Sequence, residues 1–253
     1  ESCDIQESPG VVRLRMPLHE RGSLSDQIYN GLEYDKVRSV FQEALRMYLR
    51  FTEYERVPTP DRFFLSSQPL RVLSRLADAS MRDPLINRLR GHATVSVNGK
   101  TLWNERVLFA WLERNPGLVE RLTPPHLSLY SGDGHFGNII VDWDDNIPQL
   151  RLVDWKGDTR VGDIAYDVGK LFWGIHGNWE AICREAFTVK VDGDGAVLYR
   201  WHNDHASRAV IERLRREVKA IDGVAPAVLS LDYKRCICSN SSKKRVESML
   251  TRT

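Results

Sequence analysis

A glycine-rich loop followed at once by a hairpin is the feature that most constrains how this chain folds. Residues 127–130 predict a short strand, and the loop at 131–137 contains several glycines. Residues 138–143 predict a second strand, 144–146 a turn, and 150–153 a third strand. Because a hairpin folds back on itself, its second strand ends near the loop from which its first strand begins.

Three polar side chains are placed by this pattern at one end of the hairpin. Asp133 and Asn138 lie five residues apart on the loop, and Asp154 follows Asp133 by 21 residues. Phosphoryl transfer needs a carboxylate to orient the attacking hydroxyl and oxygen ligands to hold Mg²⁺ against the phosphates. We therefore expect Asp133 to act as catalytic base and Asn138 and Asp154 as magnesium ligands. The alternative for an Asp and an Asn in one loop is turn capping.

The other expected elements follow from periodicity, capping and turn signals. Ser23 begins a capping box, Asn98-Gly99 suits a tight hairpin turn, and residues 191–195 form a turn or loop. Apolar residues recur at helical spacing in several segments. The helices expected from this spacing cover 34–54, a run through Leu70, Leu73, Leu76 and Ala77 that stops near Asp83-Pro84, 104–122, 164–176 and 206–220.

Charge and cysteine usage narrow the classes of partner. The 36 basic and 34 acidic residues give a net charge of +2, which provides no broad field for nucleic acid or an anionic membrane. The longest apolar stretch is too short to cross a membrane. The four cysteines lack CxxC spacing, which favours a reducing, cytoplasmic setting. Cys236 and Cys238 with His202 and His205 suggest a zinc site, although free thiols and surface histidines are the favoured interpretation.

Two segments carry a resemblance to a known family. The sequence GDGHFGNII at 132–140, followed by LVD at 152–154, resembles the catalytic and metal-binding segments of the aminoglycoside phosphotransferase and choline kinase superfamily. GDIAYDVGK at 162–170 resembles its next motif, in which a Gly-Asp pair and a later aspartate support the site. The resemblance is strongest over 127–177, and the stretch 171–177 looks most like members associated with sugar or capsule metabolism.

The resemblance implies an α+β, protein-kinase-like fold, mainly a helical C-terminal lobe with a β-hairpin bearing the catalytic loop. It implies Mg²⁺ as cofactor and ATP as co-substrate, with Asp133 as base and Asn138 and Asp154 on the metal. The residues that it places near the nucleotide are a hinge-like segment and a loop histidine, namely Met16, Pro17, Leu18 and His135.

Several further residues near these motifs have two interpretations. Asp163 and Asp167 suit a helix start and loop bracing better than catalysis. Trp173 and His176, with Trp179, either line an acceptor pocket or belong to the core. Lys156, two residues after Asp154, either reaches a phosphate or is solvated, the favoured interpretation.

The chain also departs from the family pattern. Ser131 stands where the family usually has a histidine, and only ten residues precede the strand expected at Val11. A phosphate-binding loop and a strand lysine therefore find no place upstream. We expect residues 1–22 to be a remnant strand and interlobe hinge, and 23–253 to be the C-terminal lobe with a basic tail from about 239.

These features predict ATP- and Mg²⁺-dependent phosphorylation of a hydroxyl on a small polar molecule, such as a sugar, amino sugar or amino alcohol. The expected partners are that acceptor and the nucleotide, not nucleic acid or membrane. One alternative is a noncatalytic kinase-like binding or scaffolding module, which the absent lysine and phosphate loop favour. Another is a fragment of a larger multidomain enzyme. The intact Asp133, Asn138 and Asp154 favour the enzyme.

Overall fold

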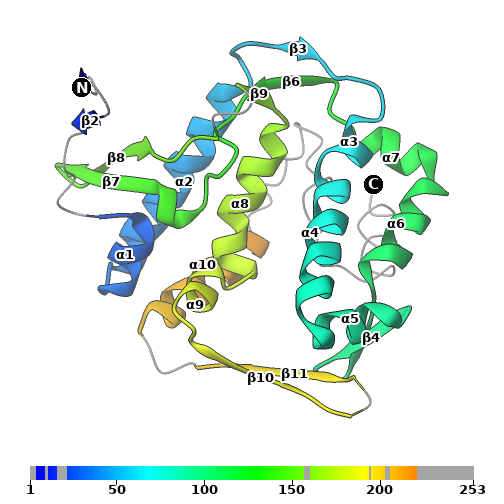
Figure 1. Cartoon of the computed structure of the whole chain (residues 1–253). Helices are drawn as coiled ribbons and strands as arrows, with labels where there is room; N and C mark the ends of the chain where they lie inside the picture. Colours follow the sequence, from blue (N-terminus) through cyan, green and yellow to red (C-terminus); the bar gives the residue numbers. More distant parts are fainter. Residues whose placement is uncertain are drawn as a thin grey trace.

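The computed structural model describes residues 4–8, 11–15, 22–156, 160–193, 195–202 and 206–220, which have an α+β organisation (Figure 1). The strand expected at residue 11 is present as β2 (Val11–Arg15), paired antiparallel with β1 (Asp4–Ser8). The expected hinge residues Met16, Pro17 and Leu18 lie outside the described residues. None of the helices described combines the length and the apolar character needed to cross a membrane.

One half of the molecule holds the larger hydrophobic core. It forms where α1 (Leu24–Tyr29), α2 (Tyr34–Phe51), α8 (Ile164–His176) and α10 (Ala206–Ala220) meet the hairpin of β7 (Ile139–Asp144) and β8 (Ile147–Leu152). The capping box predicted at the start of α1 is confirmed. Ser23 Oγ accepts from the Asp26 N–H at 3.2 Å, and the Asp26 carboxylate accepts from the Ser23 N–H at 3.3 Å.

The second half is a group of shorter helices with a smaller core. Its elements are α3 (Phe63–Ser66), α4 (Gln68–Arg82), α5 (Pro84–Gly91), α6 (Glu105–Glu113) and α7 (Pro116–Leu122). The single helix expected over 104–122 is therefore wrong. The chain breaks between α6 and α7 because Pro116 lacks a backbone N–H and disfavours helical geometry in the preceding residue. Pro116 instead occupies the first turn of α7, where that N–H is not needed.

Two small sheets connect the halves (Figure 1). The first contains β3 (Val57–Pro58), β6 (His126–Leu129) and β9 (Val161–Gly162). The second has the order β10-β11-β4-β5, formed by the hairpin of β10 (Phe187–Val191) with β11 (Val197–Trp201) and that of β4 (Thr94–Val97) with β5 (Lys100–Trp103). The hairpins join by the parallel pairing of Val197 with Val97, and the Asn98 side chain bonds the backbone of Tyr199 at both its N–H and its carbonyl.

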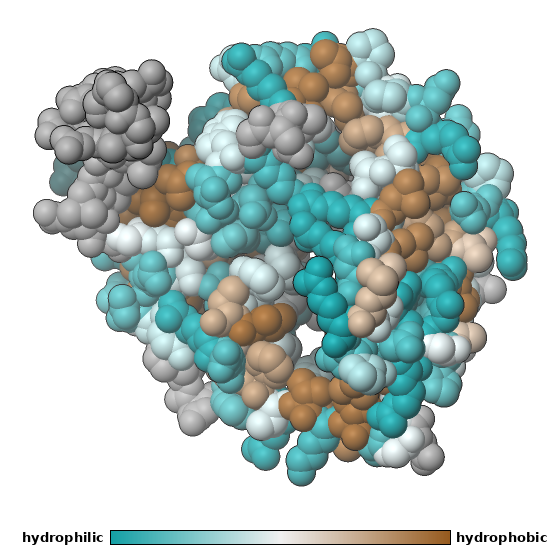
Figure 2. All heavy atoms as spheres, viewed as in Figure 1, coloured by the Kyte–Doolittle hydropathy of each residue, from teal (hydrophilic) through white to brown (hydrophobic). Residues whose placement is uncertain are grey.

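The two halves leave an opening between them. Figure 2 shows that this face of the molecule is hollowed between the halves, with hydrophobic residues gathered beneath the opening, where Figure 1 places β10 and β11. The turn or loop predicted over 191–195 begins one residue later, because Val191 is the last residue of β10, and the flanking strands were not predicted. Their signal was the alternation of apolar and polar residues in 187–191 and the apolar and aromatic composition of 197–201.

Candidate active site

The glycine-rich loop is held from beneath by Asp167, a fully buried residue of α8. Its carboxylate accepts hydrogen bonds from the Ser131 N–H at 2.6 Å, the Ser131 hydroxyl at 3.0 Å and the Gly132 N–H at 2.9 Å. Burial raises the pKa of Asp167 to about 6, against the opposing effect of these donors and of the Gly134 N–H. Asp167 therefore fixes the path of the loop.

A second set of contacts presses the loop against the core. The Tyr48 hydroxyl, fully buried on α2, donates to the Gly134 carbonyl at 3.0 Å, and burial raises its pKa well above the usual value. Phe136 is also fully buried, and a Cβ added to Gly174 of α8 would lie 2.7 Å from its ring. The loop and α8 thus pack closely enough that position 174 requires a glycine.

Asp133 sits at the exposed side of this loop and forms an ion pair. Lys170 Nζ, from α8, lies 2.9 Å from Asp133 Oδ1. Partial burial raises the pKa of Asp133, but the hydrogen bond and charge of Lys170, with the charges of His135 and Lys156, hold it below the usual value. Asp133 is therefore a carboxylate at neutral pH.

Backbone contacts bring the two other predicted residues to the same place. The Asn138 side-chain N–H donates to the Asp133 carbonyl at 3.0 Å, and the Val153 N–H donates to the Asn138 carbonyl at 3.0 Å. Asp154 follows directly, exposed and with a φ of 55°. Asp133, Asn138 and Asp154 are thus neighbours, although they come from the loop and from the far end of the hairpin.

The donor set at this point is small. Within the described ranges, no group of three or more His, Cys, Asp or Glu side chains is arranged to hold a metal ion. Mg²⁺ usually takes only one or two protein ligands and completes its octahedron with water and phosphate oxygens. The Asn138 amide oxygen and the Asp154 carboxylate fit such a set. Of the zinc candidates, His205, Cys236 and Cys238 lie outside the described residues.

His135 supports the loop in the contacts that the structure describes. Its Nδ1 accepts from the Gly137 N–H at 3.0 Å and caps a 3₁₀ turn over Phe136–Asn138. Burial lowers its pKa, although the charge of Asp133 opposes this, so the ring is neutral at neutral pH. A role toward the nucleotide stays a prediction.

Two predicted support residues lie at opposite ends of α8. Asp163 caps its amino end, where the carboxylate accepts from the Ala165 N–H at 3.0 Å. His176 lies exposed in the last turn, its ring parallel to that of Phe172 at a centroid distance of 6.0 Å. Asp163 therefore acts on the site through the position of α8.

Lys170 was not among the residues identified from the sequence. Its signal was its spacing from Asp167, because residues three apart on a helix share a face. Both side chains reach the same loop, Asp167 beneath it and Lys170 beside Asp133. Trp173, the next residue at this spacing, places its ring centroid 4.4 Å from Lys170 Nζ and so belongs to the site's surroundings.

The chain was compared with protein-family models, curated proteins and solved structures, and none of them matches it. The geometry of the loop, the hairpin and α8 is therefore the basis for a functional proposal.

Proposed function

We propose that this chain transfers a phosphoryl group from Mg²⁺-bound ATP to a hydroxyl of a small polar molecule, on a protein-kinase-like fold. One observation carries the proposal. A charged Asp133 lies on the same loop as Asn138, and the Val153–Asn138 backbone bond sets Asp154 beside them. These are a base and two oxygen ligands in the order and spacing that the resembled family uses.

In this proposal Asp133 orients the acceptor hydroxyl and takes its proton as the oxygen attacks phosphorus. Lys170 engages Oδ1, so Oδ2 is the oxygen presented to the acceptor. The low pKa of Asp133 makes it a weak base, which suits a loose transition state in which the proton leaves late. Orientation of the hydroxyl is therefore its larger contribution.

Asn138 and Asp154 would hold Mg²⁺ against the phosphates, and the ion would supply positive charge to the transferred group. The chain's own contribution is a loop that needs little rearrangement. Asp167 fixes Ser131 and Gly132, and Tyr48 fixes Gly134. A preorganised loop keeps the polar groups aimed at the reacting atoms without further cost at the moment of reaction.

The test is nucleotide binding by calorimetry, with and without Mg²⁺, on the native chain and on Asp154→Ala. Asp144→Ala is the matched control, because Asp144 is an exposed carboxylate at the other end of the same hairpin. We expect Mg²⁺-dependent binding that Asp154→Ala abolishes and Asp144→Ala leaves unchanged. Binding that ignores Mg²⁺ or Asp154 would contradict the metal site, and no binding by the folded chain would favour a noncatalytic module.

A further inference from the structure

Lysine and aromatic side chains alternate beside Asp133. We call this surface the wall, and its residues are Lys156, Tyr166, Lys170, Trp173 and Trp179. Lys170 Nζ lies 4.4 Å from the ring centroid of Trp173 and 5.6 Å from that of Tyr166. Lys156 Nζ lies 5.0 Å from the same Tyr166 ring. These are cation–π distances, so the chain's own ammonium groups occupy the rings on which a cationic ligand would otherwise bind.

Trp173 also packs against another aromatic ring. Its ring stacks on Trp179 with a centroid distance of 4.0 Å and an interplanar angle of 25°. Trp173 thus has both the Lys170 ammonium group and the Trp179 ring against it. Trp179 in turn meets the His135 ring at 6.0 Å, which brings the wall back to the loop. The chain's own side chains therefore occupy much of the surroundings of Trp173.

The carboxylates beside this wall are committed as well. Asp133 pairs with Lys170, Asp167 is buried under four loop donors, and Asp163 caps α8. Asp154, the exposed carboxylate nearby, would be engaged by Mg²⁺ under the proposed function.

In the part of the chain that the structure describes, Lys156 has a ring contact but no ion-pair partner. Its backbone N–H donates to the Ser131 carbonyl at 2.9 Å and its side chain lies against Gly132, which leaves positive charge beside the loop that carries Asp133. Because Asp133 balances the charge of Lys170, an ammonium group next to the acceptor hydroxyl would meet the uncompensated charge of Lys156.

We propose that Lys170 and Lys156 set the charge of the acceptor, so that the site takes uncharged or anionic hydroxyl compounds, such as sugars and sugar acids, and rejects amino sugars and amino alcohols. This inference rests on the proposed function, because it places the acceptor hydroxyl at Asp133. Discrimination by a built-in repulsion is a common route to specificity. An ammonium about 6 Å from one lysine, at an effective dielectric constant of about 20, would be disfavoured roughly 100-fold.

The test compares hydroxyl compounds that differ in charge, using the full chain with Mg²⁺ and ATP and following ADP release. One set is glucose, glucuronate and glucosamine, and the other is choline with its uncharged isostere 3,3-dimethylbutanol. We expect kcat/KM for the uncharged or anionic members to exceed that of the cationic members by about 100-fold. In Lys170→Met this ratio should fall at least tenfold.

Two further variants separate specificity from folding. Lys36→Met is the matched control, because Lys36 Nζ lies 5.5 Å from the Trp143 ring, in a similar contact on the hairpin. It should keep the native ratio. Lys156→Met should lower the ratio independently of Lys170, which keeps the test decisive if Lys170→Met does not fold. A ratio is the chosen measure because general damage lowers both rates together.

The remaining outcomes of these experiments also decide whether the inference holds. Preference of the native chain for glucosamine or choline would overturn the inference while supporting phosphoryl transfer. An unchanged ratio in both lysine variants would overturn it too. If none of the compounds is phosphorylated, their binding to the chain is measured in the presence of Mg²⁺ and ADP. The inference is overturned if the amines bind as tightly as the other compounds, or if no compound binds. Loss of Mg²⁺-dependent nucleotide binding would instead contradict the proposed function itself.

Discussion

Each half of the molecule contains a largely buried ion pair, and the two pairs differ in what surrounds them. In the half formed by α3 to α7, Arg90 Nε lies 2.5 Å from Glu105 Oε1, with side chains 18% and 13% exposed. In the other half, Lys170 lies 2.9 Å from Asp133, with side chains 17% and 28% exposed. Distance and burial alone would assign both pairs the same role.

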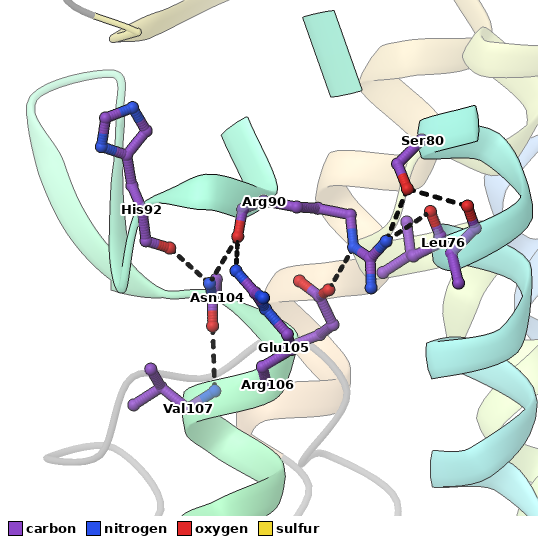
Figure 3. A network of polar contacts seen from close by, with 9 residues as sticks. Leu76, Ser80, Arg90, His92, Asn104, Glu105, Arg106 and Val107 are labelled. Carbon is purple, nitrogen blue, oxygen red and sulfur yellow. Dashed lines mark hydrogen bonds and ion pairs between the residues drawn. The ribbon is translucent and has the colours of Figure 1, made fainter. Parts of the chain in front are cut away.

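The contacts around Arg90 use the remaining capacity of its guanidinium group. Arg90 Nη1 donates to Ser80 Oγ at 2.7 Å and to the Leu76 carbonyl at 3.1 Å (Figure 3). Asn104 donates to the Arg90 carbonyl at 3.3 Å and accepts from the Val107 N–H at 2.9 Å, which caps α6. The network thus ties α4, α5 and α6 together. A satisfied network of this kind stabilises one arrangement of the chain.

The pair at the loop is satisfied on one side only. Lys170 engages Oδ1 of Asp133 and lies against two rings, while Oδ2 of Asp133 takes no hydrogen bond or ion pair from another described residue. Lys170 is held by the rings and not by further carbonyl groups. The Arg90 pair is built for stability. The open side of the Lys170 pair fits the proposed function, because reactive groups must keep bonding capacity for a substrate.

Loss of Asp133 should have the largest effect and should act on activity. In Asp133→Asn we expect phosphoryl transfer to fall about 1,000-fold, the range for loss of a general base. The free energy of unfolding should change by less than about 1 kcal/mol, since the carboxylate is partly exposed. Steady-state ADP release and urea unfolding on the same preparation check this. A stability loss comparable to that expected for Arg90 would remove the contrast between the pairs.

Asp167 should make the stability of the half that contains the glycine-rich loop depend on pH. Burial raises its pKa to about 6 from an ordinary 3.8, so between these values the folded chain binds more protons than the unfolded chain. Its contribution to the free energy of unfolding therefore rises as pH falls through this window, by up to about 3 kcal/mol, and is absent above it.

Transfer activity should move in the opposite direction, because a neutral carboxyl group holds the loop N–H groups less tightly. Urea unfolding of the native chain and of Asp167→Asn at neutral pH and at about pH 5 measures the effect. Asp167→Asn should lack this part of the pH dependence. An equal dependence in both proteins would show that other groups cause it.

Loss of Arg90 should act on stability alone. Arg90→Met leaves Glu105 mostly buried without its partner, and we expect about 2 kcal/mol of destabilisation, somewhat below the range for fully buried pairs. Arg106→Met is the control, because Arg106 is an exposed member of the same network that donates to the Arg90 carbonyl. It should cost less than about 0.5 kcal/mol. Per folded molecule, nucleotide binding should equal that of the native chain in both variants.

The smallest effects are expected from a glycine-to-alanine substitution in each half, which should change the free energy of unfolding in opposite directions. Gly174→Ala places a Cβ 2.7 Å from the Phe136 ring and should destabilise by about 2 kcal/mol through overpacking. Gly117→Ala in α7 meets no atom within 4 Å and should stabilise by about 0.5 kcal/mol through helix propensity. Thermal unfolding of both variants checks the signs. A stable Gly174→Ala would mean that the loop does not depend on close contact with α8.

The sequence predicted those elements whose signals are local. The capping box at Ser23, the hairpin turn at Asn98 and the helix Ile164–His176 are all confirmed. The helix expected over 104–122 was wrong because apolar periodicity was followed across Pro116, whose effect on its neighbours should have ended it. The strands β10 and β11 were missed because each has only five residues, which is a short stretch over which to recognise a strand pattern.

By itself, the sequence determined which polar residues stand at the ends of the loop and hairpin. Turn chemistry and strand period act between near neighbours, so the proximity of Asp133, Asn138 and Asp154 could be inferred. Only the tertiary structure decided that Lys170 pairs with Asp133 and that β11 joins β4. Such contacts depend on how helices and sheets pack, and packing between distant segments leaves no period in the sequence.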